Sequence, residues 1–138
     1  MGVIIVDIDY FKQFNDEYGH NAGDTVLIEF ARFMETHFRK SDIICRFGGE
    51  EFVVIMPTAP ETLVLSRAHS ICEKLHGLTV LHDGKKLPVI TASFGVACIS
   101  SDNYQKANIV VNLADKALYE AKRNGRDQVV LYSSSLET

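Results

Sequence analysis

The segment CRFGGEEFVVIM, residues 45–56, limits what this chain can fold into more than any other segment. Two runs of apolar and β-branched residues flank Gly48 and Gly49. Adjacent glycines favour a two-residue primed turn, because both positions of such a turn can require positive φ. We therefore expect a tight β-hairpin, with the adjacent carboxylates Glu50 and Glu51 following its turn.

The other apolar runs predict a single α+β domain around this hairpin. Residues 2–8 are β-branched and end in acids, which is typical of a buried strand that delivers side chains to a site. Apolar spacing and turn residues predict helices over 22–38, 58–77 and 110–125, strands over 88–99 and 128–132, and a second hairpin turn at 83–84. This order favours helices packed on a mostly antiparallel central sheet, with the first hairpin at its centre.

Composition supports one soluble domain of ordinary globular type. The chain has 138 residues, and we expect 1–132 to form the domain and 133–138 to form a flexible tail. The net charge of −4 gives no basic footprint, which argues against a polynucleotide or a membrane surface as partner. No apolar run approaches the roughly 20 residues that span a bilayer, so we expect a cytoplasmic protein. The three cysteines lie in apolar runs, which predicts buried, reduced thiols rather than disulfides or a zinc site.

Acidic residues gather where the first strand ends. Asp7 and Asp9 close this strand, and if the hairpin pairs beside it, Asp7 and Glu50 converge at one edge of the sheet. Carboxylate oxygens that are distant in sequence but close in space suit Mg²⁺. Each signal has a simpler alternative, because a strand end is often a solvated terminus and adjacent glutamates are often surface charge.

Three basic residues are candidate phosphate ligands. Lys12 follows the acids within a short predicted turn, while Lys122 and Arg126 lie four residues apart near a predicted helix end. The alternative for the last two is that they complement the negative end of the helix dipole.

Five motifs together resemble the GGDEF family of diguanylate cyclases, in the variant whose first acid is glutamate. They are RFGGEEF, VDIDYFKQFNDEYGHNAGD (6–24), RKSD (39–42), TASFGVA (91–97) and ADKALYEAKRNGRDQV (114–129), and they cover nearly the whole chain. The resemblance implies a palm-like nucleotidyl-cyclase fold. It also implies a bacterial signalling enzyme that condenses two GTP into cyclic di-GMP and two pyrophosphates with Mg²⁺ or Mn²⁺.

The resemblance assigns roles to the acids. Asp7, Glu50 and the carbonyl of Ile8 match the family's metal ligands. Glu51 lies in the signature and supports the site as a third catalytic carboxylate. Whether Glu50 or Glu51 assists deprotonation is left open at this point.

The resemblance also assigns the substrate contacts. The matching positions are Asn15 and Asp24 for guanine, Lys12, Lys122 and Arg126 for phosphates, and Gly48 and Gly49 for a close approach of the nucleotide. An amide and a carboxylate suit the mixed donors and acceptors of guanine. His20 matches a family position as well, and we expect it to have a structural role in the turn before the helix.

A regulatory site is implied by Arg39 and Asp42. These residues match the family's RxxD site for inhibition by the product, and their chemistry suits guanine, since a guanidinium bonds the O6/N7 edge and a carboxylate accepts from N–H groups. The alternative is a salt bridge at a helix end.

The resemblance further predicts how the enzyme is assembled. One domain holds one GTP, so catalysis needs a homodimer of facing half-sites. The family's helix before the first strand, with a motif like D-x-LTGL-x-NRR, is not in this sequence. We therefore expect an N-terminally truncated domain that follows an upstream sensory or dimerising domain.

Two other functions remain open. One is a non-catalytic receptor that binds cyclic di-GMP or GTP. The other is a palm-like transferase acting on a polynucleotide, against which the acidic balance argues.

Overall fold

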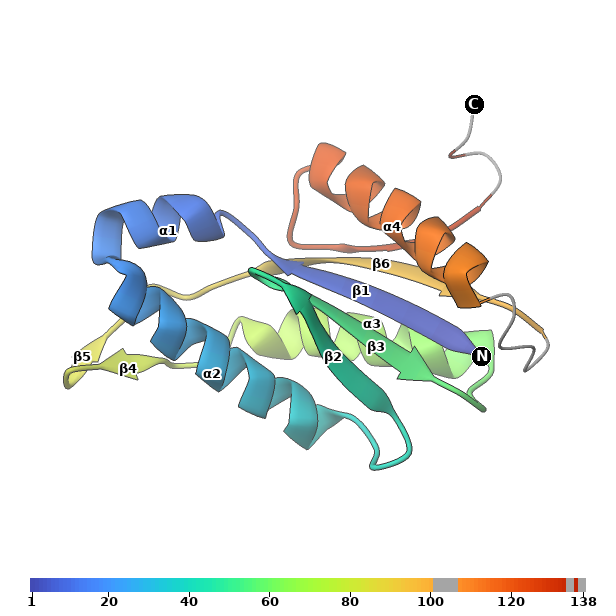
Figure 1. Cartoon of the computed structure of the whole chain (residues 1–138), viewed down its shortest axis with the longest axis horizontal. Helices are drawn as coiled ribbons and strands as arrows, with labels where there is room; N and C mark the ends of the chain where they lie inside the picture. The colour runs from blue at the N-terminus through green and yellow to red at the C-terminus, as the bar shows by residue number, and fades with distance from the viewer. Residues whose placement is uncertain (101–106, 134–135, 137–138) are drawn as a thin grey trace.

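The computed structural model describes residues 1–100, 107–133 and 136, and shows a five-stranded sheet covered by helices on both faces (Figure 1). In chain order the elements are β1 (Gly2–Ile8), α1 (Phe11–Tyr18), α2 (His20–His37), β2 (Ile43–Gly48), β3 (Glu51–Met56), α3 (Glu61–Leu75), β4 (Leu81–His82), β5 (Lys85–Lys86), β6 (Ala92–Cys98), α4 (Ala107–Arg123) and β7 (Val129–Leu131).

The sheet confirms the predicted α+β class. Its strand order is β2-β3-β1-β6-β7, and every neighbouring pair is antiparallel except β6 and β7. The expected place of the hairpin was wrong, because β1 is the central strand and β2 is an edge. All seven residues of β1 are buried, so the strand with the most continuous apolar run takes the centre.

Alternate residues of β1 support two separate cores. Ile4, Val6 and Ile8 pack in the cluster that includes α2 and α3. Val3 and Ile5 pack in a second cluster, together with Val110, Ala114 and Leu118 of α4. Because side chains alternate across a strand, Asp7 points to the α4 side of the sheet.

Helix α4 packs closely on β6 at Gly95. A Cβ atom at this position would overlap the carbonyl oxygen of Ala114 and the backbone nitrogen of Leu118. The glycine therefore sets how near α4 lies to the sheet, and with it the position of side chains at the C-terminal end of this helix.

The segment before residue 22 is helical, which the sequence prediction missed. Lys12 lies in α1 rather than in a short turn, and His20 is the first residue of α2. Phe11, Phe14 and Tyr18 have helical spacing, and their rings contact in succession, with centroids 6.4 Å and 4.9 Å apart. Only Gly19, with φ of 92°, separates the two helices.

The hairpin turn lies one residue later than predicted. Gly48 pairs with Glu51, and the register is irregular between Arg46 and Gly48, so Gly49 and Glu50 form the turn. The shift places the Glu50 backbone at the tip.

Three further expectations have mixed outcomes. The second hairpin turn, Asp83-Gly84, is confirmed between β4 and β5. All three cysteines are free, but only Cys72 is buried. The predicted burial was wrong for Cys45, which is exposed on the edge strand, and for Cys98, which is half-buried. Most of the predicted tail, 133–138, lies outside the described residues.

No helix in the described part of the chain has the length and apolar character needed to cross a bilayer.

We expect Gly95→Ala to lower the free energy of unfolding by about 2–4 kcal/mol, because the new methyl group meets helix backbone rather than a movable side chain. Gly77→Ala is the matched control, since its Cβ would lie 3.5 Å from the Lys74 carbonyl oxygen, an ordinary contact. Urea unfolding of both variants measures the difference. Equal effects of the two substitutions would contradict the packing account.

Candidate active site

The candidate site begins with a pair of carboxylates on neighbouring strands. Asp7 of β1 and Glu51 of β3 are direct cross-strand partners, so their side chains share the α4 face. Lys122 in the last turn of α4 reaches the same place, and its Nζ lies 2.6 Å from Asp7 Oδ2. Asp7 is buried, so this ion pair stabilises a charge that would otherwise lack water.

The hairpin tip adjoins the end of β1. The Ile8 N–H donates to the Glu50 carbonyl at 3.3 Å, which fixes the turn beside the strand end. Gly48 and Gly49 have φ of 148° and 51°, and an added Cβ at either would meet open space. The structure thus places the Glu50 backbone beside the end of β1 that carries Asp7 and Ile8, and leaves the glycine side uncovered by the described residues.

Negative charge is in excess around Glu51. Burial raises the pKa of the Glu51 carboxyl, and the negative charges of Asp7 and Asp115 raise the pKa further. Lys122 lowers this pKa, and Glu50 adds a smaller increase. Sequence reasoning missed Asp115, which lies in a motif already noted but can be placed near Glu51 only once α4 is docked.

The donor set fits a hard divalent cation. Carboxylate and carbonyl oxygens are the ligands Mg²⁺ prefers, and repulsion among the carboxylates is the condition that a cation relieves. No three His, Cys, Asp or Glu side chains of the described residues converge on one point as a complete ligand set. Mg²⁺ does not require one, since it is usually bound by one or two carboxylates together with substrate phosphates.

The candidate phosphate ligands come from three elements. Lys122 is already beside Asp7, while Arg126 follows α4 in a loop and its guanidinium carbon lies 4.9 Å from the centroid of the Tyr10 ring. Tyr10 directly follows the β1 acids, so Arg126 lies next to the same strand end. Lys12 is exposed on α1.

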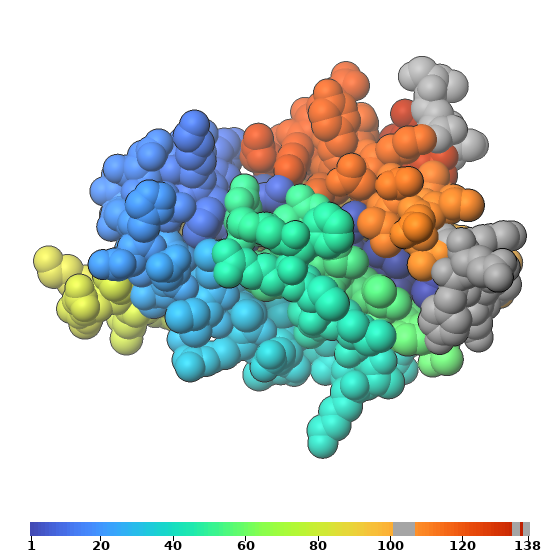
Figure 2. Space-filling view, viewed as in Figure 1, coloured from blue at the N-terminus to red at the C-terminus, as the bar shows by residue number. Residues whose placement is uncertain are grey.

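The two candidate guanine ligands flank the contact between α1 and α2. Asn15 Oδ1 is buried without a hydrogen-bond partner among the described residues, and a Cβ at Gly23 would overlap it. Asp24 is exposed and lines a cavity of about 480 Å³ with Arg46 and Phe52 of the hairpin. Figure 2 shows the hairpin, in green, between blue α1 and α2 and orange α4 on one face of the molecule.

Arg39 and Asp42 are not brought to this site. They lie beyond the C-terminal end of α2, whose 18 residues span about 27 Å. Asp42 is buried and accepts from the Arg39 backbone N–H at 2.8 Å and from its guanidinium at 3.4 Å. The salt bridge between Arg39 and Asp42 is thus present, while the Arg39 side chain remains 41% exposed.

Comparison with known proteins agrees with this geometry. The family model for the diguanylate cyclase GGDEF domain matches residues 1–128. The chain is a GGDEF domain. Diguanylate cyclase A of Treponema denticola is 40% identical over 136 residues, which are 99% of this chain and 36% of that protein.

Solved structures agree with the GGDEF assignment. The GGDEF domain of DgcB from Caulobacter crescentus in complex with c-di-GMP has a TM-score of 0.83 at 30% identity, covering 99% of this chain and 78% of that one. The active GGEEF domain of a diguanylate cyclase from Vibrio cholerae has a TM-score of 0.83 at 28% identity, covering 96% and 83%. This GGDEF domain therefore shares its fold with both, and it carries the GGEEF form of the signature.

We expect Glu51→Gln to stabilise the metal-free GGDEF domain at pH 7. Because the folded-state pKa of Glu51 is raised, the wild-type carboxyl favours folding below its unfolded pKa, and this contribution is lost as pH rises through the folded pKa. The gain at pH 7 should be below about 1 kcal/mol, because solvent screens a partly exposed group. It should vanish near pH 4.

Urea unfolding at both pH values measures this gain. Glu17→Gln, which removes an exposed carboxylate from α1, is the control and should not show it. A Glu51→Gln chain that is no more stable than wild type at pH 7 would contradict the electrostatic account.

Proposed function

We propose that this chain is the catalytic domain of a diguanylate cyclase that converts two GTP into cyclic di-GMP and two pyrophosphates. The observation that carries the proposal is the pairing of Asp7 with Glu51 and with Lys122, beside an open glycine turn whose tip carries Glu50. This arrangement offers sites for a divalent cation and for phosphates at one edge of the sheet.

Each residue has a defined task in this proposal. Asp7, Glu50 and the Ile8 carbonyl hold Mg²⁺ or Mn²⁺, which when bound neutralises phosphate charge and lowers the pKa of an attacking hydroxyl. Lys122 and Arg126 bind the phosphates, as does Lys12 from α1.

In this proposal guanine is bound beside the contact between α1 and α2. Asn15 and Asp24 offer it an amide and a carboxylate, and the unpartnered Asn15 Oδ1 supports a polar role for this amide. Gly48 and Gly49 let the nucleotide approach the backbone.

The reaction needs two copies of the domain. In each of two steps the 3′-hydroxyl of one GTP attacks the α-phosphate of the other, a 3′-O–P bond forms, and the α–β phosphoanhydride breaks to release pyrophosphate. The hydroxyl proton passes to a base. Glu50 and Glu51 are the two candidate carboxylates for this base. One domain holds one GTP, so a homodimer brings the two substrates together, and an upstream sensory or dimerising domain in the cytoplasmic protein sets how often it forms.

The central test uses the chain fused to a dimeric coiled coil, with GTP and Mg²⁺, and identifies the product by mass. We expect cyclic di-GMP from the wild-type fusion and a rate lower by several orders of magnitude from Glu50→Gln, because a metal ligand acts mainly on the transition state. Asp16→Asn on the exposed side of α1 is the charge-matched control. Full turnover by a folded Glu50→Gln fusion would remove Glu50 from the mechanism. Binding of cyclic di-GMP without any turnover would favour a receptor instead.

Feedback by the product is a separate part of the proposal. If Arg39 and Asp42 bind cyclic di-GMP, Arg39→Ala should keep the initial rate of the fusion but lose inhibition by added product, since the exposed guanidinium provides the contact. Initial rates over a range of product concentrations measure this. Inhibition at an unchanged product concentration would leave Arg39 with the structural ion pair alone.

A further inference from the structure

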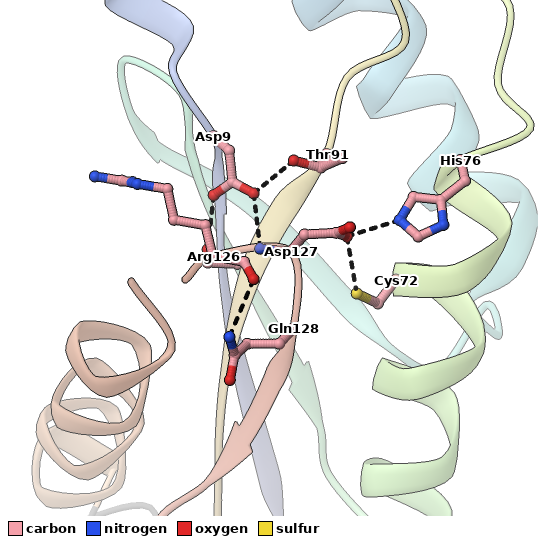
Figure 3. A network of polar contacts seen from close by, with 8 residues as sticks. Asp9, Cys72, His76, Thr91, Arg126, Asp127 and Gln128 are labelled. Atoms are coloured by element: carbon pink, nitrogen blue, oxygen red, sulfur yellow. Dashed lines mark hydrogen bonds and ion pairs between the residues drawn. The ribbon is translucent and has the colours of Figure 1, made fainter. Parts of the chain in front are cut away.

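Both oxygens of the Asp9 carboxylate accept hydrogen bonds from other parts of the chain, beside the candidate site (Figure 3). Its Oδ1 accepts from the Ser93 hydroxyl at 2.6 Å, and its Oδ2 accepts from the Thr91 hydroxyl at 2.7 Å. Oδ2 also accepts from the backbone N–H of Asp127 at 3.0 Å. Asp9 is 6% exposed, so this buried charge joins the end of β1 to the loop after α4.

The same loop is held from its other side by α3. Asp127 Oδ1 lies 2.7 Å from His76 Nε2 and accepts from the Cys72 thiol at 3.7 Å. Burial, together with the charge of Asp127, raises the pKa of Cys72 to about 12, so the thiol stays protonated and acts as a donor. Cys72 is in the last turn of α3 and His76 is the residue that directly follows this helix, and Asp127 reaches both (Figure 3).

The backbone of the loop needs such support. Arg126 and Asp127 are consecutive non-glycine residues with positive φ, 66° and 48°. L-residues rarely adopt this left-handed conformation, and it persists where surrounding contacts over-determine it. The contacts to Asp127 from Asp9 and His76 are of this kind.

The conformation fixes where Arg126 lies. Its backbone N–H donates to the Ala121 carbonyl at 2.9 Å, and its guanidinium stacks on the ring of Tyr10. The loop follows α4, which ends at Arg123, and Lys122 in the last turn of this helix contacts Asp7. Thus the loop that Asp9 and His76 hold from two sides carries Arg126, and it directly follows the helix end that carries Lys122.

We propose that Asp9, His76 and Asp127 are positioning residues that set the Arg126 loop for binding the GTP triphosphate. The inference rests on the proposed function, in which Arg126 and Lys122 contact phosphates. None of the three touches substrate in this role. They act by keeping the loop in the left-handed conformation, so loosening them should reduce phosphate binding while leaving guanine binding intact.

The test measures binding of GTP and of GMP to the chain with Mg²⁺, by competition against a fluorescent guanine nucleotide. For His76→Ala we expect about a tenfold loss of GTP affinity, while GMP affinity stays within about twofold. His69→Ala is the matched control, because His69 is an exposed residue of α3, the helix that His76 directly follows, and it makes no hydrogen bond among the described residues. Asp127→Asn, which keeps the backbone N–H to Asp9, should give a smaller loss in the same direction.

The outcomes separate the possibilities. Parallel losses for GTP and GMP would show a general structural role and overturn the inference, as would GTP affinities equal to wild type in both variants. Urea unfolding of each variant identifies any loss that comes from unfolding. If the wild-type chain bound neither nucleotide, the proposed function itself would be contradicted, and the inference with it.

Discussion

The pairing of β1 with β3 and β6 is the constraint on which the rest of the structure depends. Because both faces of β1 are buried, a slip of one residue would exchange the two cores, so the register is strongly specified. This register places Asp7 opposite Glu51 on one side and opposite Ser93 on the other. One buried strand therefore sets the positions of the candidate metal ligands Asp7 and Ile8, of the hairpin tip beside them, and of Asp9, which directly follows the strand.

Helix α4 supplies the positive charge that this strand end requires. The close approach at Gly95 docks the helix, and its last turn brings Lys122 to Asp7. Burial, followed by the charges of Asp7 and Asp115, raises the pKa of Glu51 although Lys122 lowers it. A bound metal cation would add positive charge beside these carboxylates, and the phosphates of a bound nucleotide would add negative charge beside the basic residues. Repulsion among these carboxylates is a cost that a bound cation would relieve, and active sites commonly carry such a cost.

The sequence predicted the elements whose signal is local and periodic. The apolar run of β1, the glycine hairpin and the stripe of α4 were recovered, and the structure pairs Asp7 with Glu51 and Lys122 of the signature motifs. Helix α1 was missed because its short stripe of Phe11, Phe14 and Tyr18 lies among polar residues. The role of Asp115 and the link between His76 and Asp127 depend on contacts across the fold, between residues 51 apart in the second case, which spacing does not reveal.

The most direct test of the account is whether GTP binding depends on metal through Asp7. Calorimetric titration of GTP into the wild-type chain, with and without Mg²⁺, should show binding that the metal strengthens. In Asp7→Asn this strengthening should fall by about tenfold or more, because one of the two carboxylates proposed to hold the metal is lost. The exposed Asp16→Asn should behave as wild type. A folded Asp7→Asn chain that binds GTP with the same dependence on Mg²⁺ as wild type would contradict the account.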